Sequence, residues 1–198
     1  RIIDYKSSIK DIDLNEVKAG IKLQLLTYMN EMCKQESAEP AGAFYYNLIE
    51  PMVKASQNMS DEQIEEELRK QFKMRGLILA DVDIIRKMDK NLDTGSSNII
   101  PATINKDETL SKKASNISKQ QFEYLQKYTN KIIKQISEEI LSGNINIKPY
   151  YNTKNKKTPC EYCTYKSICQ FGNGICKKEY NYISNLEKEA ILEMMKEK

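Results

Sequence analysis

The chain opens with Arg1-Ile2-Ile3-Asp4-Tyr5-Lys6, a run in which two charged side chains alternate with apolar ones. A β-strand sends every second side chain to the same face. We therefore expect Asp4 and Lys6 to point together, with Ile3 and Tyr5 on the opposite face. A carboxylate beside an ammonium group can hold a divalent cation and polarise a nearby water or phosphate oxygen. A solvated strand face is the alternative interpretation.

The following segment predicts an amphipathic helix over 14–33. Asp13 and Glu16 have the spacing of a capping box. Apolar residues then recur at three- and four-residue steps, which is the helical period: Leu14, Val17, Ile21, Leu25, Tyr28 and Met32. Gln24 and Tyr28 lie one turn apart and share a face. Two interpretations are open at this point: Tyr28 is a core residue with Gln24 at the rim, or the polar ends of both reach the place where Asp4 and Lys6 point.

These two segments together resemble the PD-(D/E)XK nucleases of the RecB type. Asp4 and Lys6 match the second acid and the lysine of that motif, and Gln24 and Tyr28 match its Gln-x-x-x-Tyr motif. The similarity extends to AddB-type nuclease domains through two more segments: Phe72-Lys73-Met74-Arg75-Gly76-Leu77, and Cys160-Glu161-Tyr162-Cys163 with Cys169 and Phe171. The resemblance covers nearly the whole chain. It implies an α/β, restriction-endonuclease-like core in which helices flank a small mixed sheet.

The resemblance also implies an activity, Mg²⁺-dependent exonuclease cleavage of DNA. Asp4 and the backbone carbonyl of Tyr5 are the implied Mg²⁺ ligands. Lys6 is implied to orient or deprotonate the attacking water and to offset transition-state charge. Gln24 and Tyr28 are implied to support the site. The family's other acids precede the strand of Asp4, so we expect this chain to be an inactive piece of a longer nuclease.

The same resemblance implies partners. In such bacterial, cytoplasmic complexes the AddB-type chain pairs with a helicase subunit of the AddA type and processes double-strand DNA ends for recombinational repair. ATP drives the complex, but the sequence contains no GxxxxGK[ST] loop, so we expect no ATP binding here. No apolar run approaches membrane-spanning length, and no membrane partner is expected. The net charge of +3 is too small to argue DNA binding by itself.

The cysteines indicate a second site. Four of the five lie within residues 160–176: Cys160, Cys163, Cys169 and Cys176. The sequence has no histidine, which excludes Ser-His-Asp and Cys-His catalysis and histidine-bound zinc within this chain. Without a secretory signal, such clustering favours metal binding over disulfides. Thiolates suit either zinc or an iron–sulfur cluster, and the spacing alone leaves both open.

The resemblance implies a [4Fe–4S] cluster with a structural role. Cys160, Cys163 and Cys169 match the family's C-x2-C-x5-C pattern, and the fourth ligand is expected outside this chain. Cys176 has no counterpart in that pattern. Two other functions stay open: a stand-alone RecB-like exonuclease of the CRISPR-associated type, and a non-catalytic DNA- or protein-binding module with zinc on all four cysteines.

The length of 198 residues suits one domain over 1–198. We divide it into a strand–helix–strand core (1–49), a helical region (60–142), a cysteine-rich segment (157–176) and a closing helix (181–198). Further elements are predicted from periodicity and turn residues: strands at 43–49, 72–79 and 99–104, and helices at 62–70, 81–88 and 119–141. The apolar stripe of the longest helix, through Ile136 and Ile140, is expected to be core. Lys73 and Arg75 are cations that a strand can carry toward phosphate.

Overall fold

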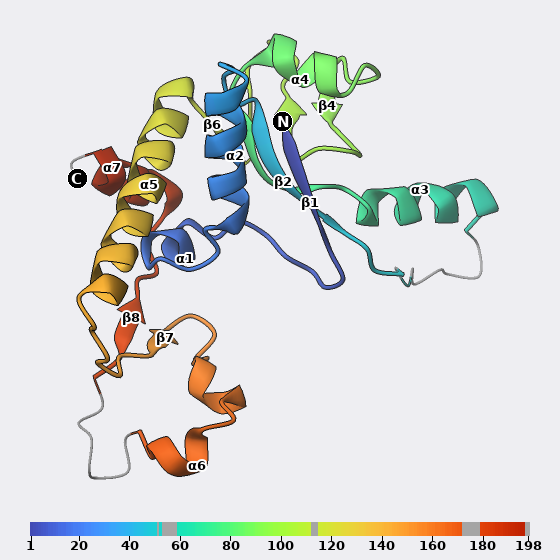
Figure 1. Cartoon of the computed structure of the whole chain (residues 1–198). Coiled ribbons are helices and arrows are strands. Elements are labelled where there is room, and N and C mark those ends of the chain that lie inside the picture. The colour runs from blue at the N-terminus through green and yellow to red at the C-terminus, as the bar shows by residue number, and fades with distance from the viewer. Residues whose placement is uncertain (51, 53–58, 112–114, 172–178, 197–198) are drawn as a thin grey trace. The chain divides into compact units, whose positions relative to one another are not determined.

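A small mixed sheet is built around the opening run. The computed structural model describes residues 1–50, 52, 59–111, 115–171 and 179–196. Strand β1 (Ile2–Lys6) pairs in parallel with β2 (Gly42–Asn47), and β2 pairs antiparallel with β3 (Arg75–Leu79). β3 pairs in parallel with β6 (Asn116–Ile117), which gives the strand order β1-β2-β3-β6. The mixed sheet flanked by helices is confirmed (Figure 1).

The chain forms two compact units. The first comprises Arg1–Ile12 and Lys22–Lys127, and the second comprises Asp13–Ile21 and Tyr128–Lys198. The boundary falls within the long helix α5 (Lys119–Leu141), whose bounds agree with the prediction. The single-domain division over 1–198 stays a prediction. In the described part of the chain, no helix has the length and apolarity needed to cross a membrane.

Both faces of the sheet in the first unit are covered. Helix α2 (Gln24–Gln35) contacts β1 and β2 and buries Leu25, Leu26 and Met29. Helix α4 (Val82–Met88), capped by Asp81, contacts β3. A buried cluster includes residues of the strands, α4 and the loops after it: Phe44, Met74, Ile78, Ile85, Leu92, Ile100, Ala102 and Ile104. Coverage of both faces explains why β2 is apolar along nearly its whole length.

Helix α3 (Asp61–Gln71) is a surface helix, as its charged sequence predicts. Ser60 and Gln63 form a capping box, and no residue of the helix is buried. Ion pairs one turn apart lie along it, including Arg69 to Glu65 at 2.6 Å. The capping hydrogen bonds and ion pairs therefore stabilise this helix, which has no buried apolar face.

The predicted strand over 99–104 is wrong for most of its length. Only β5 (Thr103–Ile104) is extended, and it pairs antiparallel with β4 (Gly95–Ser96). The side chain of Ser97 explains the difference, because its Oγ accepts hydrogen bonds from the amides of Ile99 and Ile100 at 3.0 and 3.1 Å. A local serine turn thus takes the backbone donors that a strand would use.

The predicted helix over 14–33 is also wrong, because the structure divides it. Helix α1 (Leu14–Lys18) belongs to the second unit and α2 to the first. Gly20 and Lys22 between them adopt positive φ angles of 80° and 57°. A left-handed residue ends a helix, and glycine adopts that conformation without a steric cost. The apolar spacing continues across the break, which conceals it in the sequence.

The secondary structure of the C-terminal part of the second unit differs from the prediction. It contains β7 (Tyr150–Asn152), a 3-10 helix η1 (Pro159–Tyr162), α6 (Lys166–Cys169), β8 (Asn181–Ile183) and α7 (Lys188–Lys196). The predicted closing helix over 181–198 is correct only for α7, since β8 pairs in parallel with β7. Two further core assignments are wrong: Ile136 is 41% exposed and Ile140 is 71% exposed.

Candidate active site

The alternation of β1 brings the predicted acid and lysine together. Asp4 Oδ2 lies 2.8 Å from Lys6 Nζ, and both side chains are largely shielded, with 21% and 28% of their surface exposed. Tyr5 points to the other face, where its ring meets that of Tyr46 edge-on at 5.8 Å between centroids. The strand period therefore places one ion pair on the face covered by α2, as the sequence predicts.

Helix α2 supplies the other two predicted side chains. Gln24 Oε1 accepts a hydrogen bond from Lys6 Nζ at 3.4 Å, and Gln24 Nε2 donates to the Tyr28 hydroxyl at 3.0 Å. Gln24 and Tyr28 are one helical turn apart, so one face of α2 presents both. The four predicted side chains thus form a continuous chain of contacts, from Asp4 through Lys6 and Gln24 to Tyr28.

The structure adds Tyr45 to this site. Its ring lies under the ammonium of Lys6, 5.6 Å from Nζ to the ring centroid. Tyr45 is the residue of β2 aligned with Asp4 and is 4% exposed. An aromatic face attracts a cation and fixes its position. The sequence predicts Tyr45 as strand core, and nothing in the local pattern reveals the register that puts it beneath Lys6.

The surroundings of Lys6 keep it charged. The Asp4 carboxylate raises the pKa of Lys6 above its ordinary value of 10.5, against a smaller opposing effect of burial. Lys6 is consequently an ammonium group at neutral pH. In that state it donates hydrogen bonds and neutralises negative charge, and it has no lone pair with which to take a proton from water.

Asp4 has the chemistry of a metal ligand. Its Oδ2 is buried and, apart from the ion pair with Lys6, forms no hydrogen bond of good geometry. A carboxylate oxygen left in this way fits a hard cation such as Mg²⁺, which prefers oxygen ligands and keeps several waters. Among the described residues no three acidic, cysteine or histidine side chains gather as a metal site. Asp4 is a single carboxylate, and Mg²⁺ is held firmly only where several oxygen ligands converge.

The cysteines predicted to hold a cluster lie on the short helices of the second unit. Cys160 is in η1, Cys163 follows it directly, and Cys169 ends α6. All three are free thiols, which suits thiolate ligation. The described thiols are not gathered into a three-ligand group, so the observed positions do not form a finished cluster site. Cys176 lies outside the described residues.

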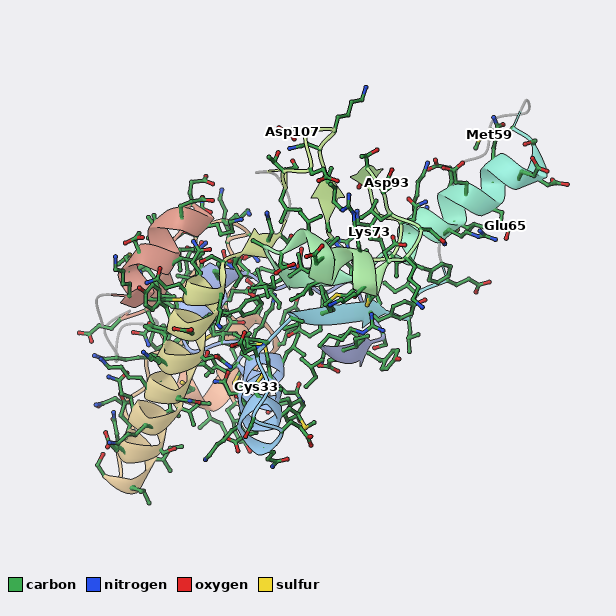
Figure 2. All side chains as sticks on the ribbon, turned by 90° about the horizontal axis from the view of Figure 1, so that it is seen from above. Cys33, Met59, Glu65, Lys73, Asp93 and Asp107 are labelled. Carbon is green, nitrogen blue, oxygen red and sulfur yellow. The ribbon has the colours of Figure 1, made fainter. Side chains whose placement is uncertain are left out.

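The remaining cysteine is separate from these. Cys33 lies near the end of α2 in the first unit (Figure 2). Burial raises the pKa of its thiol, which lowers its tendency to act as a nucleophile or metal ligand. Its position agrees with a packing role.

Comparison with known proteins identifies relatives over nearly the whole chain. Residues 1–170 match the PD-(D/E)XK nuclease superfamily. Proteins named as the B subunit of an ATP-dependent helicase/deoxyribonuclease are similar: that of Thermoanaerobacter sp. (strain X514) is 41% identical over 98% of this chain, and that of Bacillus thuringiensis (strain Al Hakam) is 40% identical over all of it. The one from Acetivibrio thermocellus is 38% identical over 98%. The chain spans 17% of the length of these relatives.

Proposed function

Because this chain belongs to the PD-(D/E)XK nuclease superfamily, we propose that it is the Mg²⁺-dependent DNA exonuclease domain of a bacterial, cytoplasmic helicase–nuclease. The observation that carries the proposal is the chain of contacts that joins Asp4, Lys6, Gln24 and Tyr28 across two elements. A solvated ion pair on a strand face would not need a helix to present two more polar groups to it.

Each side chain has a role that follows from its chemistry. Asp4 and the backbone carbonyl of Tyr5 would hold Mg²⁺, and the bound ion would supply a water of lowered pKa and would polarise the phosphate. The Lys6 ammonium would stabilise the negative charge that develops on phosphate oxygens. Its raised pKa favours this role over that of a general base. Gln24 and Tyr45 fix the ammonium in position, and Tyr28 orients Gln24.

The names of the relatives support a place in a larger machine. We propose that this domain acts on DNA together with a helicase subunit of the AddA type, processing double-strand ends for recombinational repair. ATP would be used by the complex and not bound by this chain, whose sequence has no phosphate-binding GxxxxGK[ST] loop. The relatives' names favour this assignment over a stand-alone exonuclease.

The cysteines form a separate part of the proposal. Cys160, Cys163 and Cys169 would provide three thiolates to a [4Fe–4S] cluster, with a fourth ligand from elsewhere in the longer protein. Their free thiols support this donor set. The proposed role is to join parts of that protein, and none of the catalytic steps above depends on it.

Replacement of Asp4 tests the activity. In the full-length protein assembled with its partner, Asp4→Asn should slow Mg²⁺-dependent release of labelled nucleotides by more than about a hundredfold, because the lost metal contact stabilises the transition state by several kcal/mol. Asp93→Asn is the matched control, since the Asp93 side chain is 94% exposed on a turn outside the contact chain. Equal activity of both variants would contradict the proposal.

The chain by itself should be a poor nuclease. Among the four side chains that contact one another, Asp4 is the one carboxylate, and a single carboxylate holds Mg²⁺ weakly. We expect the 198-residue chain to show less than about 1% of the rate of the assembled full-length protein, a loss of roughly 3 kcal/mol in transition-state stabilisation. A rate comparable to the assembled complex would show that Asp4 needs no further acid.

A further inference from the structure

A cleft of about 540 Å³ opens beside Asn47, the residue of β2 aligned with Lys6. Its walls come from the loop after β1, the end of β2, the end of α3 and the start of β3. Asn47 holds one wall, because its Oδ1 accepts a hydrogen bond from the amide of Lys10 at 2.8 Å. This contact fixes the loop that carries Ile9 and Asp11 into the cleft.

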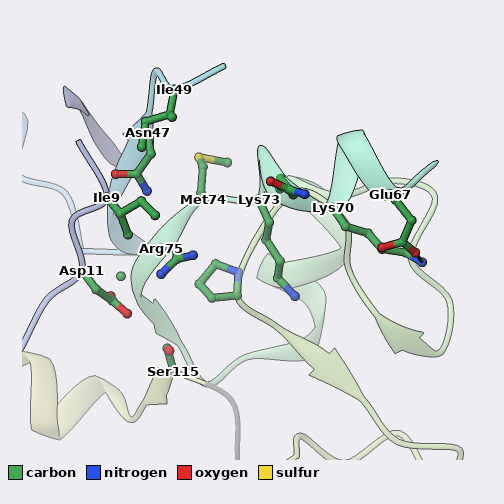
Figure 3. A pocket seen from close by; sticks show the side chains of 13 residues that line it. Ile9, Asp11, Asn47, Ile49, Glu67, Lys70, Lys73, Met74, Arg75 and Ser115 are labelled. Carbon is green, nitrogen blue, oxygen red and sulfur yellow. Dashed lines mark hydrogen bonds and ion pairs between the residues drawn. The ribbon is translucent and has the colours of Figure 1, made fainter. Parts of the chain in front are cut away.

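Three cations line the cleft, and their surroundings differ (Figure 3). Lys70, on α3, is neutralised by Glu66 and Glu67 at 3.2 and 2.7 Å. In the described part of the chain, Arg75 has no carboxylate partner, and Lys73 Nζ has only a neutral one, Ser96 Oγ at 3.1 Å. Two of the three cations therefore have no ion-pair partner among the described residues. Besides Glu67, which binds Lys70, Asp11 is the other carboxylate that the described residues contribute to the same cleft.

The charge of Lys73 is also partly shielded from water. Burial lowers the pKa of Lys73 from its ordinary value, with no carboxylate to oppose the effect. Burying an ammonium group is unfavourable unless an anion offsets the loss of hydration. An anionic ligand in the cleft would supply that compensation.

The sheet register places Arg75 in line with Asp4. Asp4 is aligned with Tyr45, and Tyr45 is aligned with Arg75. Aligned residues on neighbouring strands share a face, so the three lie in one row. Two strand spacings separate Asp4 from Arg75, about 10 Å between Cα atoms. Lys6 is aligned in turn with Asn47, which lines the cleft. One wall residue of the cleft is thus the strand neighbour of Lys6.

We propose that Lys73 and Arg75 form a phosphate-binding subsite that holds the backbone of the DNA strand beside the bond cut at Asp4. The proposal rests on the nuclease function proposed above and extends it, since it assigns a second contact with the same strand. Arg75 presents a planar guanidinium that can bind a phosphate through two hydrogen bonds, and Lys73 adds a point charge. Such contacts position a strand without reading its sequence.

Salt-dependent binding tests the subsite without requiring cleavage. A fluorescent single-stranded oligonucleotide is titrated with the 198-residue chain in EDTA at several salt concentrations. Each phosphate contact on a single strand contributes about 0.7 to the slope of log affinity against log salt. The double variant Lys73→Gln/Arg75→Gln should reduce the slope by about 1.4 and weaken binding on the order of tenfold at low salt.

Lys70→Gln is the matched control, because it removes a cation from the same cleft whose charge is already neutralised. It should leave the slope within about 0.3 of the original, well below one phosphate contact. Lys73→Arg/Arg75→Lys should keep the slope. An oligonucleotide with uncharged methylphosphonate linkages should bind both the original chain and the double variant equally weakly. Circular dichroism checks that each variant is folded.

An unchanged slope in a folded Lys73→Gln/Arg75→Gln variant would overturn the subsite, as would an absence of DNA binding by the original chain. A third result would also overturn it. If inorganic phosphate saturates the original chain and the Lys73→Gln/Arg75→Gln variant loses this phosphate binding while its DNA binding is unchanged, the cleft is a small-anion site. These outcomes are independent of the nuclease proposal, which fails only if Asp4→Asn leaves cleavage by the full-length protein intact.

Discussion

Gly76→Ala should strongly destabilise the first unit. Gly76 lies in β3 directly opposite Phe44 and has a φ of 142°, a conformation that side chains rarely adopt. An added Cβ would collide with the carbonyl oxygen of Ala43 and lie 3.0 Å from Phe44 Cα. Both obstacles are backbone atoms of a neighbouring strand, which cannot rotate aside as a flexible side chain does.

The expected cost has two parts. The backbone conformation costs an alanine about 1–3 kcal/mol. Relief of the collision requires β2 and β3 to separate, which weakens adjacent ladder hydrogen bonds at roughly 1 kcal/mol each. The free energy of unfolding should therefore fall by about 3–5 kcal/mol. For a chain of this size, the melting temperature should fall on the order of 10 °C.

Urea unfolding followed by circular dichroism measures this change. Gly95→Ala is the matched control, since Gly95 also has a positive φ, 94°, but a Cβ there would meet nothing within 4 Å. The control should lose only about 1–2 kcal/mol, the cost of the conformation itself. Equal losses in the two variants would refute the close approach of β2 and β3 at Gly76.

Three further predictions concern charge, helix capping and the cysteines. Because Asp4 raises the pKa of Lys6, the stability linked to the Lys6 proton is complete below the ordinary pKa of 10.5 and is lost as pH rises through the higher folded-state pKa. Lys6→Met should remove this part of the fall in stability at alkaline pH, measured by urea unfolding. The same fall in the variant and the original chain would contradict the ion pair. Ser60→Ala should remove the capping box with Gln63 and cost α3 about 1 kcal/mol, seen as roughly fivefold faster amide exchange in that helix, whereas unchanged exchange would show that the cap contributes nothing. In the anaerobically purified full-length protein, Cys163→Ser should abolish bound iron and its broad visible absorption, and full iron content in the variant would exclude Cys163 as a ligand.

The candidate site was predictable because two short periods determine it. A period of two puts Asp4 and Lys6 on one face of a strand, and a period of 3.6 puts Gln24 and Tyr28 on one face of a helix. Their meeting requires only that α2 packs on the face of β1 that carries the ion pair. Local pattern predicts the two faces, and the resemblance to the nuclease family supplies the expectation that these four residues form one site.

Residues that depend on strand register were not predictable in the same way. Tyr45 reaches Lys6, and Arg75 joins the row of Asp4, only because β1, β2 and β3 align as they do. Register between strands separated by tens of residues is determined by packing of the whole sheet, including the close approach at Gly76. A single sequence gives no direct signal of it.

The errors in the predicted helices have a related cause. The apolar period continues from α1 into α2, while the conformations of Gly20 and Lys22 end the first helix. Apolar spacing at Asn181–Ile183 is too short to distinguish helix from strand, and pairing with β7 decides the outcome. Tertiary partners override local preference at both places.

Localisation of a divalent cation at Asp4 is the most direct test of the proposed site. Mn²⁺, which replaces Mg²⁺ at oxygen ligands, broadens the NMR signals of nearby amides because it is paramagnetic. Titration of the isotope-labelled 198-residue chain should first broaden the amides of Tyr5, Lys6 and Gln24, and Asp4→Asn should abolish this selective effect. Broadening that is unchanged in Asp4→Asn, or that spares β1 while affecting other segments, would contradict a metal-dependent nuclease site at Asp4.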